Sequence, residues 1–428
     1  MRPVRTLPFK TTWLRGIPRQ DRIFEAFQRY FVESPSRPKD NERYQRALFA
    51  AWKDFALGVK VKPLHINDSI KYFKHPEKSP GLPYTKEGLL HKYEVDPNRI
   101  KQYAHNLKYG YYTKCITPCS TATRTHVDPV KEKVRLVWVY PAHMTYIEGM
   151  FAQPLIAAYQ AKKGAYGVWI QYRLGHLRYL MSQRRKSAKW LGTDFSCFDS
   201  SIPAWIIRDA FNILKSQIDF SAYTFWGKPT HDGTLQRLWC KIVEYFINTP
   251  LKLPTGVVVK KYKGVPSGSY FTSLIDSIVN SIVMHYLLDG KDYGARFFLG
   301  DDGLIEVFSA LNLEALAEES MQIFGLVINP SKSEFGEFVS FLGYKMSSDG
   351  IPLANYDKLM AQLCLPSRKD KCLEDQIQRV RALQLACFGL GCVRFWDETQ
   401  TWLSTIEQHE DPRPSKRSDV FRMLESLG

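Results

Sequence analysis

Three aspartates in this chain stand where carboxylates could act together. Asp301 and Asp302 are adjacent, and they lie between glycines directly after an apolar run. A chain of 428 residues should contain about one Asp-Asp pair by chance, so the pair alone also fits an ordinary surface turn. Asp194 follows a second apolar stretch, which begins after Lys189. If both stretches are neighbouring strands, the three carboxylates meet at one end of a sheet.

Carboxylates that converge in this way repel one another, and the repulsion raises the pKa of at least one of them. A hard divalent cation such as Mg²⁺ relieves the repulsion and also binds substrate phosphates. Two such ions about 4 Å apart can activate an attacking hydroxyl and stabilise a leaving pyrophosphate. The pattern therefore fits phosphoryl transfer on a polyanion. A helix N-cap at Asp194 and a plain turn at Asp301 and Asp302 fit the spacing equally well.

The segments around these aspartates predict a small, largely antiparallel sheet backed by helices, which is an α+β core. A strand ends near Asp194, and a helix starts near Ser201 or Pro203. The stretch "ARFFLGDDGLIEVF" predicts a β-hairpin with both aspartates at its tip. The sequence also predicts a helix with a wide apolar face after the loop at Gly268, a helix that ends at Gly325, and a strand in "VSFLGYKM".

The composition is that of a folded, basic protein with a polyanionic partner. Hydrophobic residues make up 44% of the chain, and 59 Lys and Arg against 43 Asp and Glu give a net charge of +16. Clustered basic residues favour phosphate backbones. No secretory signal or transmembrane segment is predicted, so the cytosol is the expected compartment. The cysteines lack a metal-binding spacing and are expected to be free thiols: Cys115, Cys119, Cys197, Cys240, Cys364, Cys372, Cys387 and Cys392.

Short motifs around the aspartates resemble those of viral RNA-dependent RNA polymerases, in family order. "DFSCFD", which begins at Asp194, resembles motif A. "SGSYFT", which begins at Ser267 and is followed by Asn280, resembles motif B, and "GDD" at Gly300 resembles motif C. The segment "GVPSGSYFTSLIDSIVNS" most resembles the corresponding segment in the polymerases of partitiviruses, which are small viruses with segmented double-stranded RNA genomes.

Three further motifs complete the resemblance, which covers roughly residues 79 to 345. "KEKVR" resembles motif F, "NPSKSEF" motif D and "FLGY" motif E. The family has a right-hand fold of fingers, palm and thumb. The resemblance therefore implies an N-terminal region with fingers over 1–190, palm motif A over 191–203, a fingers insertion over 204–262, palm motifs B to E over 263–365, and a thumb with the C-terminal tail over 366–428.

The resemblance also implies unequal roles for the acidic residues. Asp194 and Asp301 would bridge two Mg²⁺ or Mn²⁺ ions, whereas Asp302 would be the lesser partner, because neighbours along a strand cannot aim identically. Asp199 would read the ribose 2′-hydroxyl, which distinguishes RNA from DNA. A reverse transcriptase would be expected to carry a bulky aromatic residue there. A helix N-cap is the plainer interpretation of Asp199.

The motif B residues that would lie near the nucleotide belong to one loop and the helix after it: Ser267, Gly268, Thr272, Asp276 and Asn280. The loop residues would let the backbone approach the substrate closely. Asp276 stands where picornavirus-like polymerases commonly carry Asn, and it shares a helix face with Asn280. Asn280 is favoured as the partner of Asp199, because an Asp276–Asp199 contact would need a shared proton or a cation. A solvated helix charge remains an alternative for Asp276.

Basic residues alternate along a predicted strand that includes Val134 and Val139. Lys131, Lys133 and Arg135 would line the nucleotide channel and hold triphosphate oxygens, with Arg124 as a further candidate. An exposed basic strand face is the plainer interpretation. Lys332 resembles the motif D lysine, which could protonate the leaving pyrophosphate as a general acid, although a surface lysine after an Asn-Pro turn fits equally well.

These observations favour an RNA-dependent RNA polymerase that adds ribonucleotides to an RNA 3′-hydroxyl and so replicates and transcribes a viral RNA genome. The expected partners are RNA template and product, ribonucleoside triphosphates and, as a further candidate, a viral capsid protein, with no membrane. The expected location is the virion interior or the host cytoplasm. A reverse transcriptase and a non-catalytic RNA-binding or capsid-associated protein are the alternatives.

Overall fold

The computed structural model describes residues 2–39, 41–112, 116–388 and 390–406 of the chain. Cys115 and residues 407–428 of the expected thumb and tail lie outside these ranges. The cysteines within them are free thiols. None of the described helices combines the length and the hydrophobicity that crossing a membrane would require.

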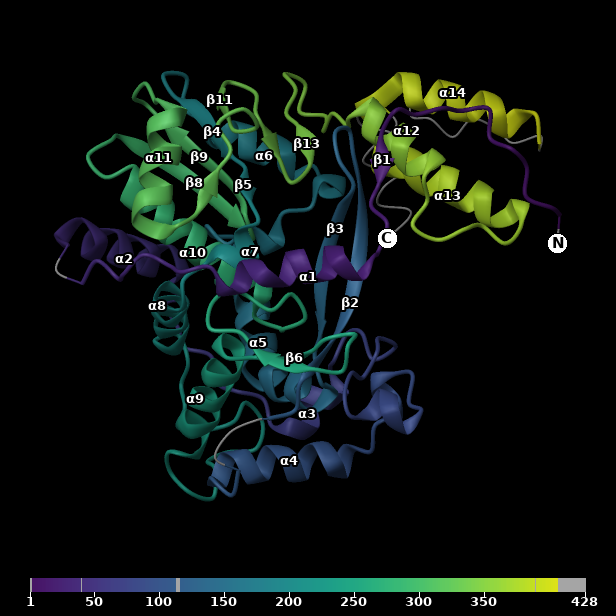
Figure 1. The fold of residues 1–428 in the computed structure, drawn as a ribbon. Helices are drawn as coiled ribbons and strands as arrows, with labels where there is room; N and C mark the ends of the chain where they lie inside the picture. Colours follow the sequence, from purple (N-terminus) through teal and green to yellow (C-terminus); the bar gives the residue numbers. More distant parts are fainter. Residues whose placement is uncertain (1, 40, 113–115, 389, 407–428) are drawn as a thin grey trace.

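The central sheet has four antiparallel strands in the order β11 (Glu334–Gly336), β4 (Lys189–Thr193), β9 (Asp302–Val307) and β8 (Tyr293–Leu299). The pair β8 and β9 is the predicted hairpin, and β4 lies directly beside β9 (Figure 1). The antiparallel α+β core predicted from the sequence is thereby confirmed. This order brings the end of β4 to the hairpin turn.

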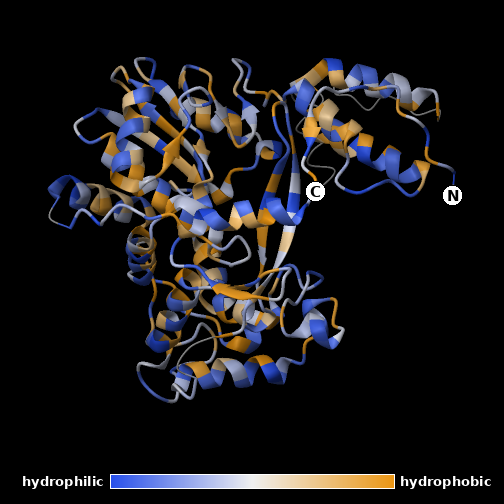
Figure 2. Ribbon diagram, viewed as in Figure 1, coloured by the Kyte–Doolittle hydropathy of each residue, from blue (hydrophilic) through white to orange (hydrophobic). Residues whose placement is uncertain are grey.

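Both faces of the central sheet are buried, which explains why its strands read as apolar runs. Leu191 and Ile305 belong to the core that contains helix α10 (Thr272–Leu287). Trp190 and Leu304, their neighbours along the strands, belong to a second core on the opposite face. Figure 2 shows hydrophobic segments, in orange, gathered in these strands. Polar groups at the end of the sheet are therefore close to a largely apolar interior.

A second sheet contains the long hairpin of β2 (Cys119–Asp128) and β3 (Lys133–Val139). Strand β6 (Pro250–Lys252) pairs with β2 in parallel, and β7 (Val258–Lys260) pairs with β6. At the other end of β2, β1 (Leu14–Arg15) pairs with it. The N-terminal region and the segment 204–262 thus share one sheet.

Helices surround the two sheets: α1 (Gln20–Gln28), α2 (Glu42–Phe55), α3 (Ile66–Lys71), α4 (Pro97–Tyr109), α5 (Ala142–Lys162), α6 (His176–Gln183), α8 (Ala204–Lys215), α9 (Thr234–Ile247) and α11 (Leu313–Phe324). Most residues in the first half of α5 are buried. Helix α11 ends at Gly325, whose φ of 67° forms the C-cap that the sequence predicts.

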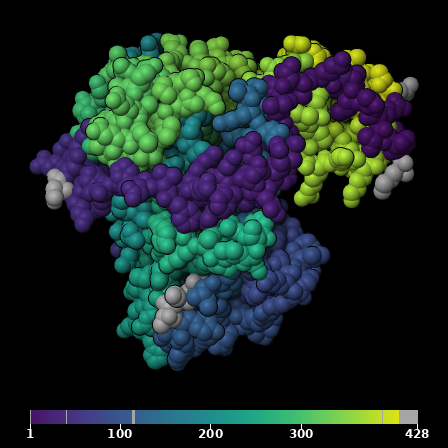
Figure 3. Space-filling model, in the orientation of Figure 1, coloured from purple at the N-terminus to yellow at the C-terminus, as the bar shows by residue number. Residues whose placement is uncertain are grey.

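Three C-terminal helices, α12 (Tyr356–Cys364), α13 (Leu373–Ala386) and α14 (Val393–Ser404), share a small core of their own. The N-terminal segment lies against them. Gln376 exchanges two hydrogen bonds with the Arg5 backbone, and the Leu373 N–H donates to the Arg2 carbonyl. The same segment, in purple, then continues through β1 and α1 across the front of the molecule (Figure 3). It therefore joins the C-terminal helices to the sheets.

One local prediction was wrong. The stretch "VSFLGYKM" is not one strand but a tight hairpin of β12 (Ser340–Phe341) and β13 (Tyr344–Lys345). Leu342 and Gly343 turn the chain with φ values of 50° and 81°, and a leucine rarely adopts such an angle. The helix predicted near Ser201 or Pro203 is α8, which begins at Ala204 with Pro203 as its N-cap residue, and the short helix α7 (Phe198–Ser201) precedes it.

Candidate active site

The hairpin turn gives the two adjacent aspartates different settings. Leu299 pairs with Asp302, so Gly300 and Asp301 form the two-residue connection. Gly300 has a φ of 67°, which this position of a tight hairpin readily accommodates in glycine. An added Cβ at Gly300 would meet no atom within 4 Å, whereas one at Gly303 would lie 2.8 Å from the Thr193 hydroxyl. Asp301 is thus at an open tip, and Asp302 already belongs to strand β9.

Asp194 lies beside this hairpin, and the motif D segment holds its backbone. Thr193 pairs with Gly303, so the next residue, Asp194, comes next to Asp302. The Asp194 N–H donates to Ser333 Oγ over 3.1 Å, and the Asp194 carbonyl accepts from the Asn329 N–H over 2.8 Å. Strands β5 (Phe195–Ser196) and β10 (Val327–Ile328) pair just beyond. These contacts fix the carboxylate between two strand pairs.

The charges of this cluster are not balanced. Burial raises the pKa of Asp302 to about 7, and the carboxylates of Asp301 and Asp194 contribute to the shift. Burial also raises the pKa of Asp194, against the Lys332 ammonium, which favours the charged form. The three aspartates are therefore close enough to disturb one another, as their positions at the strand ends predict.

Asp199 and Asp276 belong to the same cluster. Burial and the charge of Asp301 raise the pKa of Asp199 to about 6. Asp276, on helix α10, is 4% exposed, and burial with the nearby Asp199 raises its pKa well above the ordinary value. Its Oδ1 has no hydrogen-bond partner. Asp199 lies inside α7, for which Cys197 is the N-cap residue, so Asp199 is not itself an N-cap.

Asn280 contacts the hairpin turn. Its Nδ2 donates to the carbonyls of Gly300 and Asp301 over 3.2 and 3.0 Å, and its Oδ1 is buried without a partner. The sequence favours Asn280 over Asp276 as the partner of Asp199. In the structure, Asp276 lies close enough to Asp199 for the charge of Asp199 to raise its pKa, whereas Asn280, one turn further along α10, donates to the hairpin turn. Which of the two partners Asp199 stays a prediction.

The basic residues approach the cluster to different degrees. Lys133 and Arg135 on β3 both lower the pKa of Asp194, although burial and Lys332 have larger effects on it. Arg124 is paired directly with Arg135 across the hairpin. Lys131 precedes β3 in an exposed turn, where its backbone N–H donates to Asp128. Lys332, Lys133 and Arg135 are therefore brought to the aspartates, and Lys131 stands at the rim.

The motif B loop packs closely on β3. Ser267 Oγ accepts from the Trp138 N–H over 3.2 Å, and a Cβ at Gly268 would lie only 1.8 Å from the Trp138 carbonyl oxygen. The Thr272 hydroxyl donates to the carbonyls of Pro266 and Ser269. The close approach predicted at Gly268 is thus an approach to a neighbouring strand. Ser267 and Thr272 hold the shape of the loop.

Two residues near the site are not predicted from the sequence. Glu148 of α5 is fully buried, and its Oε2 accepts from Ser269 Oγ and the Tyr270 N–H over 2.8 and 2.7 Å. A lone acid in the apolar stretch of α5 could have indicated it. Tyr30 donates to the Val265 carbonyl over 3.2 Å. No local pattern relates Tyr30 to a loop so far along the chain.

The donor set suits a hard divalent cation. Asp194, Asp301 and Asp302 offer carboxylate oxygens, and their mutual repulsion would be relieved by such an ion. Among the described residues, however, no three acidic, histidine or cysteine side chains form a ready-made metal group. Water and substrate phosphates would have to complete the coordination, as Mg²⁺ usually requires. The residues therefore fit a cation that binds together with the substrate.

Comparison with known proteins identifies the family. The model of the family "Viral RNA-dependent RNA polymerase" matches residues 28–387. The RNA-directed RNA polymerase of Cryptosporidium parvum virus 1 is 25% identical over 401 residues, which cover 86% of this chain and 73% of that protein. The polymerase of Atkinsonella hypoxylon virus is 34% identical over 375 residues, or 74% of this chain, and the match spans about half of that relative, 53%.

Solved structures agree with the fold. The crystal structure of the RNA-dependent RNA polymerase of a human picorbirnavirus superposes with a TM-score of 0.66 at 15% identity, and the match covers 96% of this chain and 84% of that one. This likeness confirms the right-hand polymerase fold. With the motifs in place around one acidic cluster, and with relatives from partitivirus-like viruses, the chain belongs to the family of viral RNA-dependent RNA polymerases, which are nucleotidyltransferases.

Proposed function

We propose that the chain performs template-directed addition of ribonucleotides to an RNA 3′-hydroxyl, with release of pyrophosphate. One observation carries the proposal: Asp194 lies beside Asp301 and Asp302, so their carboxylates share one site. Asp194 and Asp301 would hold two Mg²⁺ or Mn²⁺ ions, with Asp302 as the lesser partner. When bound, such ions lower the pKa of an attacking hydroxyl and neutralise charge on the leaving group.

The basic residues would handle the triphosphate. Lys133 and Arg135 extend from β3 toward the aspartates, and Arg135 can bind two phosphate oxygens at once. Lys332 is close enough to Asp194 to lower its pKa, which supports Lys332 as the ammonium group that would protonate the leaving pyrophosphate. Lys131 and Arg124 would attract the nucleotide from further out.

Asp199 and Asp276 would select the sugar. An Asp276 side chain that burial keeps protonated can donate a hydrogen bond, as an Asn side chain does, and so leaves Asp199 free to accept from the ribose 2′-hydroxyl.

Asp276→Asn should then preserve the preference for ribonucleotides, whereas Asp276→Leu and Asp199→Leu should weaken it. Competition between labelled ribo- and deoxyribonucleoside triphosphates measures this. An unchanged preference in Asp199→Leu would remove Asp199 from sugar selection.

The domain limits given above are part of the proposal. The pairing of β6 with β2 supports the assignment of residues 204–262 to the fingers, because the strand β6 extends a sheet of the N-terminal region. We also propose that synthesis takes place in a virion interior or in host cytoplasm, with RNA template and product and a capsid protein as partners. The partitivirus-like relatives support this setting.

The test of the function is synthesis by the purified chain on a short single-stranded RNA. Labelled product of template length should appear only when all four ribonucleoside triphosphates and Mg²⁺ are present. Deoxyribonucleoside triphosphates should not replace the ribonucleotides, which also separates this activity from reverse transcription. Absence of templated product under all metal conditions would contradict the proposal.

A further inference from the structure

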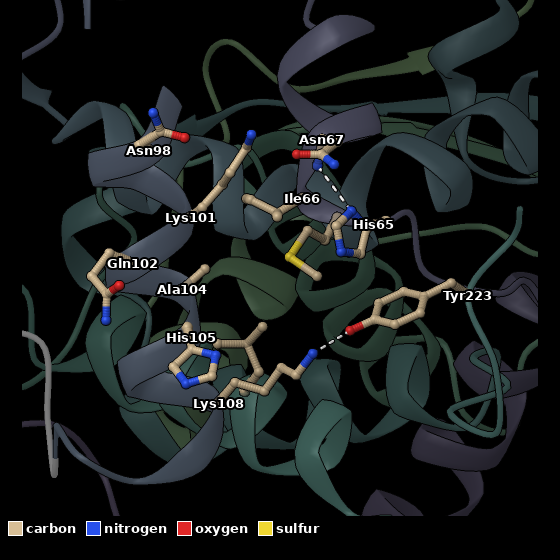
Figure 4. Close-up of a pocket in the computed structure, with 12 residues that line it drawn as sticks. His65, Ile66, Asn67, Asn98, Lys101, Gln102, Ala104, His105, Lys108 and Tyr223 are labelled. Carbon is tan, nitrogen blue, oxygen red and sulfur yellow. Dashed lines mark hydrogen bonds between the residues drawn. The ribbon is translucent and has the colours of Figure 1, made fainter. Parts of the chain in front are cut away.

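A second polar site lies far from the acidic cluster. Helices α3, α4 and α9 enclose a pocket of about 450 Å³ near the base of the molecule, at the opposite end of Figure 1 from the hairpin of β8 and β9. His65, Asn67, Lys101, His105 and Lys108 are among the residues that line it, and no lining residue is acidic (Figure 4). The pocket is therefore a basic site with hydrogen-bonding groups.

Helix α4 supplies most of these polar groups from one face. Four of its pocket-lining residues recur at intervals of three or four, which places them on the same side of the helix: Asn98, Lys101, His105 and Lys108. Gln102 and Ala104 also line the pocket. The opposite face carries the buried Ile100 and Leu107. The alternation of blue and orange along α4 in Figure 2 shows the same division. The buried face anchors the helix, and on the basic face Lys108 packs on neighbouring rings, those of Tyr109 and Tyr223.

Among the described residues, the two lysines of this pocket have no acidic partner; the carboxylate of Asp68, which follows the pocket residue Asn67, instead accepts from Trp226 Nε1 over 2.7 Å and favours the charged form of His65. Within the described part of the chain, neither Lys101 nor Lys108 takes part in an ion pair, and the Lys108 ammonium donates to the neutral Tyr223 hydroxyl over 2.5 Å. Burial and the nearby Lys108 lower the pKa of His65. An anion in the pocket would relieve this uncompensated charge.

Aromatic rings adjoin the basic pocket. His65 Nδ1 accepts from the Asn67 N–H, which leaves the proton of the neutral ring on Nε2 as a donor. The Trp226 ring lies against His65, with ring centroids 4.6 Å apart, and 54% of Trp226 is exposed. The neighbouring Phe225 is 68% exposed. Exposed aromatic faces beside unpaired ammonium groups are what base stacking and phosphate binding require.

We propose that this pocket, with Trp226 beside it, is an accessory binding site for single-stranded RNA. Lys101 and Lys108 would hold two backbone phosphates, and bases would stack on Trp226. The two lysines together with the exposed Trp226 ring favour RNA over a small inorganic anion, because an inorganic anion has no base that could stack on the ring. None of the residues of this site contacts the acidic cluster, so the site is independent of the polymerase reaction. A test of RNA binding at this site is therefore separate from a test of catalytic activity.

The test is photo-crosslinking of the full chain to a single-stranded RNA of about 12 nucleotides that contains 4-thiouridine. Peptides that contain Lys108 or Trp226 should carry crosslinks. Lys101→Glu with Lys108→Glu should remove these crosslinks and lower the slope of log affinity against log salt by about 1.4, at about 0.7 per lost phosphate contact. Trp226→Ala should weaken binding about tenfold without a change in slope.

Matched controls use the same substitutions elsewhere. Lys186 and Lys291 are exposed lysines outside the pocket, and Trp52 is a partly exposed tryptophan, 38% exposed. Their Glu and Ala variants should bind RNA as the wild type does. If the lysine double variant does not fold, Lys101→Gln with Lys108→Gln replaces it. Equal crosslinking in the lysine variant and the wild type would overturn the proposal. Displacement of the RNA by free GTP, at a GTP concentration that saturates a nucleotide-binding site, would also overturn it.

Discussion

Helix α10 contributes to two groups of buried acids that differ in how their charge is compensated. Asp54, whose side chain is 6% exposed, accepts from His285 over 2.8 Å and from Arg296 over 2.9 Å. Burial alone would raise its pKa, but these hydrogen bonds outweigh burial and lower it. Asp54 itself lies on α2, whereas Asp276 lies on α10, more than two turns before His285, and has no cationic partner and a raised pKa.

The difference separates a structural acid from the acids that we propose to bind cations. The Asp54 network joins α2, α10 and β8 and is electrostatically complete within the protein. The acidic site around Asp301 is left with excess negative charge, which costs stability and creates affinity for cations. Of the two groups beside α10, the charges of the Asp54 network are therefore balanced, whereas those of the acidic site, where we propose that the reaction takes place, are not.

The largest expected effect comes from removing one charge of the acidic site. Asp301→Asn should lower polymerase activity by about 1000-fold, because a group that stabilises transition-state charge is lost. The melting temperature should stay the same or rise, since repulsion with Asp302 and Asp194 is relieved. Product formation and thermal unfolding measure the two effects. A large loss of stability would show that the site is balanced after all.

The reverse result is expected at the balanced network. Asp54→Asn should destabilise the fold by about 3 to 5 kcal/mol, because it removes the buried carboxylate that pairs with Arg296 and accepts from His285. Urea unfolding measures this loss, and the activity of the folded fraction should remain within a few-fold of the wild type. Asp232→Asn, at an exposed position, is the control and should change stability by less than about 0.5 kcal/mol.

Added cation should distinguish the two groups directly. Mg²⁺ at about ten times its dissociation constant should stabilise the wild type by about 1.4 kcal/mol, and chelation should remove the gain. The same gain should appear in Asp54→Asn, because the network around Asp54 holds no free carboxylate charge. It should be absent from Asp301→Asn. An equal gain in all three proteins would place the cation elsewhere.

The smallest expected effects are those of pH on stability, and they have opposite signs for two buried acids, Asp54 and Glu148. The lowered pKa of Asp54 means that its contribution to stability is present above the unfolded pKa of about 3.9 and is lost as the pH falls below it. Burial raises the pKa of Glu148 to about 8, so stability should instead decline as the pH rises from about 4.3 to about 8.

Unfolding curves across this range test both signs. Asp54→Asn should flatten the acid limb, and Glu148→Gln should flatten the decline toward pH 8 while it keeps an acceptor for Ser269 and the Tyr270 N–H. Part of the decline should remain in Glu148→Gln, because the pKa values of Asp199 and Asp302 are also raised, to about 6 and about 7. A decline as steep as that of the wild type would assign it to these groups alone.

Sequence reasoning succeeds here where a local pattern determines the geometry. The apolar runs identify β4 and the hairpin, and the turn residue Gly300 places Asp301 at its tip. It fails where a contact depends on packing between distant segments. Nothing local predicts that Asn280 donates to the turn or that Glu148 holds the motif B loop.

The hairpin at Leu342 fails for a different reason. Leucine seldom adopts a positive φ, so its sequence favours a continuous strand, and only tertiary packing holds the turn. The sequence thus predicts that Asp194, Asp301 and Asp302 lie together, and it misses Glu148 and Tyr30, which support the loop beside them.

The N-terminal segment has a consequence for how the protein is made. Arg2 contacts Glu374 across 372 positions of the chain, and Tyr30 contacts Val265 across 235. Contacts of such long separation form late and slow folding, because a long loop must close first. A chain still emerging from the ribosome lacks the C-terminal helices against which this segment packs. Newly made molecules therefore complete the framework around the site only after synthesis has passed residue 376.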